Sequence, residues 1–586
     1  MKKVIIFLTS VCLFCSLAVS TKVVKANSND YFKGQTLTIY NVEDYISQGE
    51  EGYVDIIGNF EKEYGVKVNY YTYDTNETMY NQFTLQKEGT YDLICTSDYM
   101  IQKMIKEELV DPIDVSKIPN YEKYAAKTLR EKLKAMNVPY EGRTVNLDEF
   151  AVGYMWGTLG IVYDPECSDT IREDVKSWDV FWNPTYKNVI SIKNSIRDAF
   201  VAGLMHSYSK DIEFQKVMNA YLDDPNETNK LKYNALVQDI FDFKLDGSQA
   251  SDLENKEKIA RVKEELISMK KNIFGFEVDS GKNDIITGKI KLNLAYSGDA
   301  VYSINTAMED ADKVLEYYVP EDGSNIWYDA WTMPKGAKNK ELAYEFLNYL
   351  SDPINAADNM DYIGYTPYIV GDELFTLTAS WYGAADYDVN SYYSEETKVI
   401  YDNVLYECIK EKESENDALP TNEEYFESCE YDSETTYEED DMISFNGKIY
   451  NCLARTNLSP TEDVESWEEV EGYDLDFLFG NTGSFKEGLR RAVIYPFAGS
   501  QNQLETQYPS ENIIARCAIM NDFGSYNDQV VIMWGQVKAY TNMLPVYIFL
   551  ITFVVILIAI TVYVLIKHHI VKNYKKSRLD RIRWGF

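Results

Sequence analysis

Carboxylates and aromatic rings stand side by side at three points of the sequence. Glu43-Asp44-Tyr45 and Ser97-Asp98-Tyr99 each follow a strand-like run. Trp327-Tyr328-Asp329 forms a third group, in which we expect one turn to present a ring and a carboxylate together. A carboxylate pairs with an ammonium group, while an aromatic ring covers methylene groups and attracts a cation to its face. Residues of these types along one slot would bind a flexible organic amine. Since 14% of all residues are aromatic, the pattern alone does not single out any one of the three groups.

The scarcity of histidine argues against catalysis and zinc chemistry. The chain has His206 and then His568 and His569 near its C-terminus, whereas zinc hydrolases need a convergent cluster and catalytic triads need a histidine beside a nucleophile. We therefore expect a binding protein and not an enzyme, with no catalytic residue, metal or cofactor. Between residues 27 and 542 the cysteines show no metal-ligand spacing, and their even number permits disulfides whose pairing stays open. They are Cys95, Cys167, Cys408, Cys429, Cys452 and Cys517.

The N-terminus has the form of an export signal. Met1-Lys2-Lys3 precedes an apolar run over residues 4–19, a length typical of a signal peptide and short for a bilayer span. We assign residues 1–26 to a signal peptide, with the small residues of Val23–Ala26 as the cleavage signal. An uncleaved signal anchor stays open as the alternative.

A second apolar segment, residues 543–566, predicts a transmembrane helix. It holds 24 residues without a charge, which span about 36 Å at a rise of 1.5 Å per residue. The tail, residues 567–586, carries seven Lys and Arg against the single Asp580, so the positive-inside rule places it in the cytoplasm. We therefore expect a single-pass protein of the cell membrane whose ectodomain is extracellular.

The ectodomain is strongly acidic. The whole chain has a net charge of −37, and removing the four lysines of residues 1–26 and the net +6 of the tail leaves −47 for residues 27–542. Such a surface repels nucleic acid and anionic lipid and attracts organic cations. Solubility alone explains the acidity equally well.

The alternation of strand-like and helical patterns predicts an α/β fold with a largely parallel sheet. In such folds ligands bind beyond the carboxyl ends of strands and between lobes. In the first domain we predict strands over 36–41, 66–73 and 91–95 and a helix over 54–64. A further helix starts at Asn76, whose side chain we expect to cap it. A second α/β stretch covers 154–327, and a helix covers 339–350.

Residues 390–472 break this pattern and contain an internal repeat. Tyr401–Cys408 recurs 44 residues later as Phe445–Cys452, and Pro420-Thr421 with Phe426 recurs as Pro460-Thr461 with Trp467. The repeat predicts an insert of two small β units.

Over residues 36–382 and 503–540 the chain resembles the spermidine/putrescine-binding proteins of bacterial ABC importers. The order and approximate spacing of the motifs match that family throughout. The motifs are Ile39-Tyr40-Asn41 with Asp44-Tyr45, Tyr73–Tyr80, Tyr91-Asp92-Leu93 leading to Ser97 and Lys103-Met104, Tyr154–Gly157, Ser177-Trp178, Trp182-Asn183-Pro184 with Tyr186-Lys187, Trp327-Tyr328-Asp329, Ala337–Lys340 and Ile363-Gly364-Tyr365.

The resemblance implies a two-lobed α/β fold of the periplasmic-binding-protein (flytrap) type, with a small β-rich insert and a C-terminal transmembrane helix. Its cleft closes on the ligand between the lobes. The expected boundaries are 27–153 and 329–373 for lobe 1, 154–328 and 374–542 for lobe 2 with the insert at 390–472, 543–566 for the membrane helix and 567–586 for the tail.

Carried over position by position, the resemblance also implies the ligand-binding residues. Three positions depart from the family pattern: Val42 replaces a ring, Ser195 replaces an acid, and Met520 replaces an amide. We interpret these departures as a changed selectivity among polyamines. The expected ligand-binding residues are Asp44, Tyr45, Ser97, Tyr99, Asp198, Tyr296, Trp327, Asp329 and Tyr365.

The insert resembles the small chitin- and cellulose-binding modules of bacterial chitinases, through Asp441–Tyr450 followed by Trp467–Val470. The rings of Tyr450 and Trp467 could stack on a cell-wall polysaccharide, or they could form the core of a small β fold. For the whole chain the resemblance implies a membrane-anchored protein that captures polyamines and delivers them to an ABC permease with its ATPase. The alternative is an anchored sensor or adhesin for a cationic ligand or a cell-wall polysaccharide.

Overall fold

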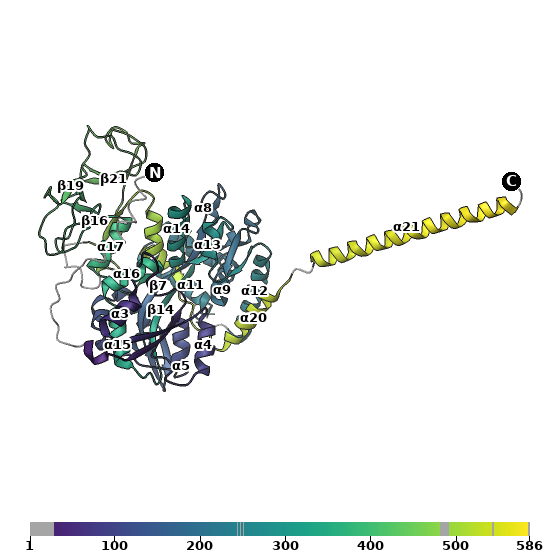
Figure 1. Ribbon diagram of the computed structural model, residues 1–586, viewed down its shortest axis with the longest axis horizontal. Helices are drawn as coiled ribbons and strands as arrows, with labels where there is room; N and C mark the ends of the chain where they lie inside the picture. The colour runs from purple at the N-terminus through teal and green to yellow at the C-terminus, as the bar shows by residue number, and fades with distance from the viewer. Residues whose placement is uncertain are drawn as a thin grey trace. The chain divides into compact units, whose positions relative to one another are not determined.

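A mixed β-sheet forms the centre of the computed structural model (Figure 1). The structure describes residues 29–242, 244–245, 248–249, 251–480, 491–541 and 544–583. The signal peptide expected at residues 1–26 lies outside the described residues. The main path of the sheet follows the order β11-β8-β12-β7-β14-β3-β1-β2. The chain therefore crosses between the two halves of the sheet more than once.

Two long antiparallel strands, β7 (Ala151–Tyr163) and β14 (Ser324–Pro334), join the two halves. Every residue of both strands is buried, as expected for strands covered on both faces. β14 pairs with β3 through residues 329–332, and β7 pairs with β12 through residues 159–163. Each half of the sheet therefore rests on a different part of the same strand pair.

Lobe 1 is the half of the sheet built on β1 (Thr36–Val42), β2 (Lys67–Tyr73) and β3 (Leu93–Ser97), which run parallel. This confirms the predicted α/β class of the first domain. The helices predicted over 54–64 and 339–350 are present with their apolar faces buried. The main helices of this lobe are α3 (Ile56–Tyr64), α4 (Asn76–Leu85), α5 (Asp98–Lys106), α15 (Lys340–Leu350) and α16 (Pro353–Ile363).

The start of α4 differs from the prediction by one residue. The hydroxyl of Thr75, and not the side chain of Asn76, accepts the hydrogen bond from the backbone N–H of Thr78 at 3.2 Å. Asn76 instead accepts from the Thr96 hydroxyl at 2.6 Å and donates to the Ser97 hydroxyl at 2.9 Å. The cap expected at Asn76 is wrong because this side chain fixes the carboxyl end of β3.

Lobe 2 is the half built on β8 (Ile190–Lys193), β11 (Gly275–Glu277) and β12 (Leu292–Tyr296), where β8 runs parallel to both neighbours. Several of its helices cluster on one side of the long strands in Figure 1. They are α9 (Ile196–Tyr208), α10 (Ile212–Asp223), α11 (Glu227–Phe241), α12 (Asp252–Lys270), α13 (Gly281–Ile286) and α14 (Ser297–Ala311).

Further elements complete the two lobes. They are α2 (Asn29–Phe32), β4 (Val110–Asp111), η2 (Val115–Lys117), α6 (Pro119–Tyr124), α7 (Lys127–Ala135), β5 (Asn137–Tyr140), β6 (Arg143–Asn146), η3 (Leu147–Glu149), α8 (Ile171–Asp174), η4 (Trp178–Trp182), η5 (Pro184–Tyr186), β9 (Lys244–Leu245), β10 (Ser248–Gln249), β13 (Glu316–Tyr318), β15 (Thr366–Pro367), α17 (Asp372–Tyr382), α18 (Gln501–Gln507), α19 (Glu511–Ala515), β25 (Cys517–Ala518) and η7 (Gly524–Tyr526).

The repeat region forms two three-stranded antiparallel units of the same design. In each unit a hairpin turns through two residues with positive φ, Asp402-Asn403 (50° and 63°) and Asn446-Gly447 (51° and 73°), as two-residue type I′ turns require. The equivalent cysteines Cys408 and Cys452 pair with a ring on the third strand in both units. The strands are β17 (Lys398–Tyr401), β18 (Val404–Cys408) and β19 (Phe426–Ser428), then β20 (Met442–Phe445), β21 (Lys448–Cys452) and β22 (Trp467–Glu469).

The insert is attached through β16 (Gly383–Asp386), β23 (Tyr473–Asp474) and β24 (Val493–Pro496). β16 and β23 flank β24 on opposite sides, because Ala385 and Tyr473 both pair with Ile494. The chain therefore enters and leaves the insert about two strand spacings apart, roughly 10 Å.

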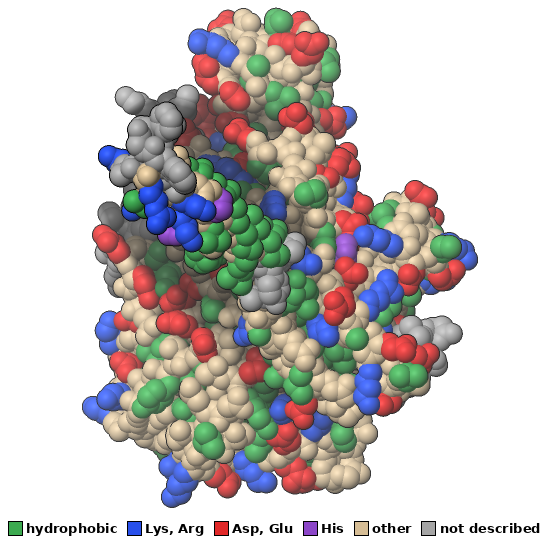
Figure 2. Space-filling view, turned by 90° about the vertical axis from the view of Figure 1, so that its right-hand side faces the viewer, with side chains coloured by type: hydrophobic (Ala, Val, Ile, Leu, Met, Phe, Trp, Pro, Cys, Tyr) green, Lys and Arg blue, Asp and Glu red, His purple; other side chains and the backbone are tan. Residues whose placement is uncertain are grey.

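The C-terminal part of the chain, from Ile532, is a separate unit. α20 (Asn527–Ala539) leads into it, and α21 (Leu544–Arg583) is 40 residues long. Within α21, residues 548–579 are long and apolar enough to cross a membrane. Figure 2 shows hydrophobic side chains gathered along this helix and Lys and Arg side chains near its end.

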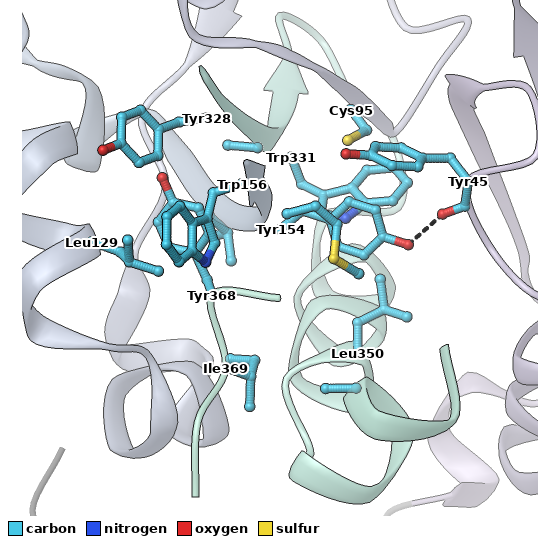
Figure 3. Close-up of a cluster of buried hydrophobic side chains, with 14 of the residues drawn as sticks. Tyr45, Cys95, Leu129, Tyr154, Trp156, Tyr328, Trp331, Leu350, Tyr368 and Ile369 are labelled. Atoms are coloured by element: carbon cyan, nitrogen blue, oxygen red, sulfur yellow. Dashed lines mark hydrogen bonds between the residues drawn. The ribbon is translucent and has the colours of Figure 1, made fainter. Parts of the chain in front are cut away.

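The main core is rich in tyrosine and tryptophan. Figure 3 shows Tyr45, Cys95, Tyr154 and Trp331 gathered on one side of this cluster, with Tyr154 donating a hydrogen bond to the backbone oxygen of Tyr45. The Tyr154 hydroxyl accepts in turn from Asn359 at 2.8 Å. This chain of contacts fixes the segment that follows β1. All six cysteines of the described residues are free thiols.

Candidate ligand-binding site

Strand ends from both lobes face each other beside the middle of β14. β3 ends at Ser97, which pairs with Asp329 of β14, while β12 ends at Tyr296, which pairs with Leu159 of β7. Continuing the β7–β14 register from the pair Ile326–Thr158 sets Leu159 level with Asn325, so the two strand ends are offset by about four residues, roughly 13 Å, along the strand direction. β7 and β14 lie between them in the sheet. β3 and β12 run in opposite directions, so their carboxyl ends converge on this gap. Ligands in α/β sheets bind at such ends.

Asp329 lies on β14 at this gap. The strand register shifts directly after it, as at a β-bulge, and such irregularities re-aim a side chain. Asp329 is 9% exposed, and its Oδ2 accepts a hydrogen bond from the Tyr45 hydroxyl at 2.8 Å. Its Oδ1 is buried with no hydrogen-bond partner among the described residues.

The environment of Asp329 disfavours its charge. Burial raises the pKa of this carboxyl to about 6, against the favourable effect of the nearby Ser97 and Tyr45 hydroxyls, and the charge of Asp198 raises it further. No ion pair with a cation involves Asp329 in the described part of the chain. An ammonium group beside Asp329 would remove this electrostatic penalty.

A second buried carboxylate, Asp198, comes from lobe 2. It lies in the first turn of α9, where its backbone N–H donates to the Ser195 hydroxyl that caps the helix. The Tyr296 hydroxyl donates a hydrogen bond to its Oδ2. Burial raises the pKa of Asp198, although hydrogen bonds from Ser195 and Tyr296 oppose this. Asp198 and Asp329 are thus two carboxylates of one kind, each buried and each accepting a hydrogen bond from a tyrosine hydroxyl.

Trp327 links the two halves of the site. Its ring centroid lies 5.8 Å from Tyr296 and 5.5 Å from Tyr365, with both pairs edge to face. Tyr365 lies 5.3 Å from Tyr45, again edge to face. These rings form one continuous aromatic wall between the carboxylates, suited to methylene groups and to cations.

Two glycines allow this wall to close. A Cβ on Gly157 would lie 2.7 Å from the Trp327 ring, and a Cβ on Gly298 would lie 2.3 Å from the Tyr365 ring. Real side-chain carbons do not approach so closely. Glycine at positions 157 and 298 therefore leaves the space that the Trp327 and Tyr365 rings occupy.

A third acid, Asp299, is already paired. Its Oδ2 lies 2.8 Å from the Lys193 ammonium, and its Oδ1 accepts from the Tyr365 hydroxyl at 2.7 Å. Burial alone would raise the pKa of Asp299, but Lys193 and Lys282 outweigh it and hold the pKa below its usual range. We did not predict this pair from the sequence, where its signals are a lysine that ends a strand-like run and an acid three residues after Tyr296.

Arg197 is a second cation missed by the sequence prediction. Its guanidinium lies 3.8 Å from the Tyr99 ring centroid and donates to the backbone oxygens of Met520 and Asn521. The Tyr99 hydroxyl donates to Glu77 at 3.0 Å. Tyr99, expected to face the ligand, therefore has its ring against a cation of the protein itself.

The structure brings most of the expected residues together, but not all of them. Tyr45, Ser97, Asp198, Tyr296, Trp327, Asp329 and Tyr365 surround the facing strand ends through the contacts above. Asp44 is exposed and has a φ of 53°, and no hydrogen bond or ion pair given for the described residues connects it to this group. Ser195 caps the helix α9. Met520 is buried, and its backbone oxygen accepts a hydrogen bond from the Arg197 guanidinium.

The ring of Trp467 in the insert is not available for stacking on a sugar. Trp467 is 5% exposed and donates to the backbone oxygen of Leu458 at 3.0 Å, and it packs on Tyr437 and Cys452 in the core of its unit. This burial agrees with the alternative that the ring is a core residue. Among the described residues, no group of three or more His, Cys, Asp or Glu side chains is arranged to hold a metal ion.

Buried carboxylates under aromatic rings, between facing strand ends of two lobes, define a two-lobed ligand-binding protein of the periplasmic-binding-protein type. The family model described as bacterial extracellular solute-binding protein matches residues 55–371, and the chain belongs to this family.

Relatives of this chain carry names that specify a ligand. The chain is 28% identical over 362 residues to the spermidine/putrescine-binding periplasmic protein of Salmonella typhimurium, covering 62% of this chain and 84% of that protein. It is 28% identical over 335 residues to the putrescine-binding periplasmic protein PotF of Escherichia coli, covering 56% and 77%. These relatives confirm the resemblance predicted from the sequence.

The chain is also similar in sequence to a protein of solved structure. The spermidine/putrescine ABC transporter substrate-binding protein PotD of Streptococcus pneumoniae is 28% identical, with 57% of this chain and 84% of that chain covered and a TM-score of 0.40.

Proposed function

We propose that this protein captures polyamines outside the cell and delivers them to an ABC permease. The observation that carries the proposal is the pair Asp329 and Asp198, two buried carboxylates without an ion-pair partner among the described residues. Each has a raised pKa that a neighbouring ammonium group would lower. The names of the relatives support the same ligand class.

The aromatic wall matches the rest of such a ligand. An ammonium at Asp329 and another at Asp198 would place the connecting methylene groups along Trp327, whose ring lies between Tyr296 and Tyr365. Rings attract the charged ends through their faces and cover the apolar chain. A zwitterionic amino acid offers one cation and leaves one carboxylate without a counter-charge, and a neutral sugar leaves both without one.

The same proposal includes the membrane anchor. α21 contains a helix long and apolar enough to span a bilayer. Its residues 548–566 carry no charge, and the seven Lys and Arg of residues 567–586 that follow favour the cytoplasmic side. The two lobes, with boundaries at 153, 328 and 373 and the insert at 390–472, would then lie outside the cell. Anchoring would keep the captured ligand near the permease without a soluble carrier.

Calorimetry on the full chain in detergent tests the proposal. Spermidine or putrescine should bind, whereas single amino acids and neutral sugars should give no heat above dilution. Binding should also raise the melting temperature in proportion to ligand excess. A protein that binds an amino acid or a sugar and ignores every polyamine would overturn the proposal.

A further inference from the structure

The Lys193 ammonium is a cation of the protein that lies at the wall of the candidate site. Lys193 ends β8, its side chain is 4% exposed, and its Nζ lies 2.8 Å from Asp299 and 3.3 Å from Glu277. The same Nζ lies 5.5 Å from the ring centroid of Tyr296. Lys193 therefore contacts a carboxylate and a ring as a ligand ammonium would.

Asp299 is joined to the site through Tyr365. The Tyr365 hydroxyl donates to Asp299 at 2.7 Å, and the Tyr365 ring packs edge to face on Trp327 and Tyr45. Asp299 thus accepts a hydrogen bond from the Tyr365 hydroxyl, as Asp329 does from Tyr45 and Asp198 does from Tyr296. The three acids are alike in burial and in their tyrosine partner. They differ in one respect, since Asp299 alone of the three has an ion pair in the described structure.

We propose that Lys193 takes the place of a ligand ammonium at Asp299 and thereby makes the site selective for diamines over triamines. This inference rests on the proposed function. Two carboxylates, Asp329 and Asp198, remain for the ligand, and a third ammonium would meet a carboxylate that is already neutralised. Placing it there would require displacing a buried lysine or burying a cation without a partner, and both are costly.

Arg197 limits the site in the same way on the side of lobe 1. Its guanidinium covers the Tyr99 ring and donates to two backbone oxygens of the 520–521 segment. A ligand ammonium cannot use that ring face while Arg197 occupies it. Lys193 and Arg197 therefore reduce the number of carboxylates and ring faces that a ligand can contact.

The test compares putrescine and spermidine on the full chain in detergent by calorimetry. The parent protein should bind putrescine at least tenfold more tightly than spermidine. Lys193→Met should reverse or abolish this preference, with spermidine gaining at least tenfold relative to putrescine, because Asp299 loses its ion-pair partner and keeps only the more distant charge of Lys282. Lys193→Arg keeps the charge and should keep the preference for the diamine.

A second variant guards against a folding defect in Lys193→Met, which leaves two buried acids unpaired. Lys193→Met combined with Glu277→Gln removes one cation and one anion, so the charge of the cluster is unchanged while Asp299 still becomes free. This variant should melt near the parent and also favour spermidine. A folded double variant with an unchanged preference, or a parent that prefers spermidine, refutes the role of Lys193 while leaving the proposed function intact. A parent that binds no polyamine refutes both.

Discussion

Replacing Asp329 with asparagine separates the charge of this side chain from its shape. Asp329 is buried, accepts from Tyr45, and has one oxygen without a partner among the described residues. In Asp329→Asn the side chain keeps its size and can still accept from Tyr45. A ligand ammonium placed beside it, however, loses its counter-charge in a buried site.

The expected loss of affinity is large. Removing one partner of a buried, hydrogen-bonded charge pair costs about 2–5 kcal/mol, which corresponds to roughly 30-fold to several thousand-fold in Kd. Calorimetry with putrescine at pH 7.5 measures this directly. Asp169→Asn is the matched control, since Asp169 is exposed and far from the strand ends in the sequence, and it should bind as the parent does.

The same change should stabilise the unliganded protein. Burial raises the pKa of Asp329 from 3.8 to about 6, so the folded state holds the proton more tightly than the unfolded state. The resulting penalty is absent below pH 4, grows between pH 4 and pH 6, and is complete above pH 6, where it amounts to about 3 kcal/mol. Asp329→Asn removes this penalty, so its unliganded form should melt about 2 °C above the parent at pH 7.5 and no higher at pH 4.

The two readouts together decide the argument. An Asp329→Asn protein that melts at or above the parent and binds polyamine weakly supports the assignment of Asp329 to the ligand. If the variant melts normally and binds polyamine as tightly as the parent, Asp329 does not meet the ligand and the reasoning fails. If the variant melts lower than the parent at pH 7.5, the Asp329 carboxylate stabilises the folded state, and the argument from its raised pKa is refuted.

Three further predictions concern other parts of the chain. Trp327→Leu should weaken polyamine binding about 2- to 30-fold in calorimetry, since the cation–π attraction of about 0.5–2 kcal/mol is lost while apolar contact remains; an unchanged Kd would remove the ring from the site. Replacing residues 390–472 with a short flexible linker should keep the affinity within a few-fold, because β16 and β23 flank β24 and need only a short connection; complete loss of binding by a folded protein would show that the insert shapes the site. Protease added to intact cells should release the ectodomain and leave the tail of residues 567–586 protected; immunoblots that show tail cleavage would contradict the proposed topology.

The sequence predicted the α/β class because the relevant signals are local. The helix predicted over 54–64 and the strands predicted over 36–41 and 66–73 depend on neighbours within a few positions. The structure has these elements at Ile56–Tyr64, Thr36–Val42 and Lys67–Tyr73, within two residues of the predicted bounds. The type I′ turns of the repeats are equally local, since Asn446-Gly447 needs no distant partner to adopt positive φ.

The Trp327-Tyr328-Asp329 motif shows where local reasoning stops. We expected one turn to present a ring and a carboxylate together, whereas the three residues lie within the strand β14. Side chains alternate along a strand, so Trp327 and Asp329 share the face toward the site. Tyr328 points to the other face, where it packs on Tyr368. The expected turn is wrong, although the pairing of ring and acid remains.

The internal cations could not be predicted because they depend on strand order. Lys193 and Asp299 are far apart in the sequence and meet only because β8 and β12 are neighbours in the sheet. Arg197 and Tyr99 come from helices of different lobes. No spacing rule within one segment reveals such a pair.

Under the proposed function, selectivity for polyamines would come from the buried residues and not from the acidic surface. The net charge of −47 on residues 27–542, obtained from −37 by removing +4 and +6, attracts every cation, and salt screens it over about 8–10 Å. Surface charge can therefore raise the rate of encounter without distinguishing one amine from another. In the proposed site a ligand would meet two carboxylates that have no ion pair among the described residues, and a third that already forms an ion pair with Lys193. The number of ammonium groups that a ligand can satisfy is then set by the internal lysine, so changing Lys193 should alter which polyamine binds, while changing surface acids should alter only how fast it arrives.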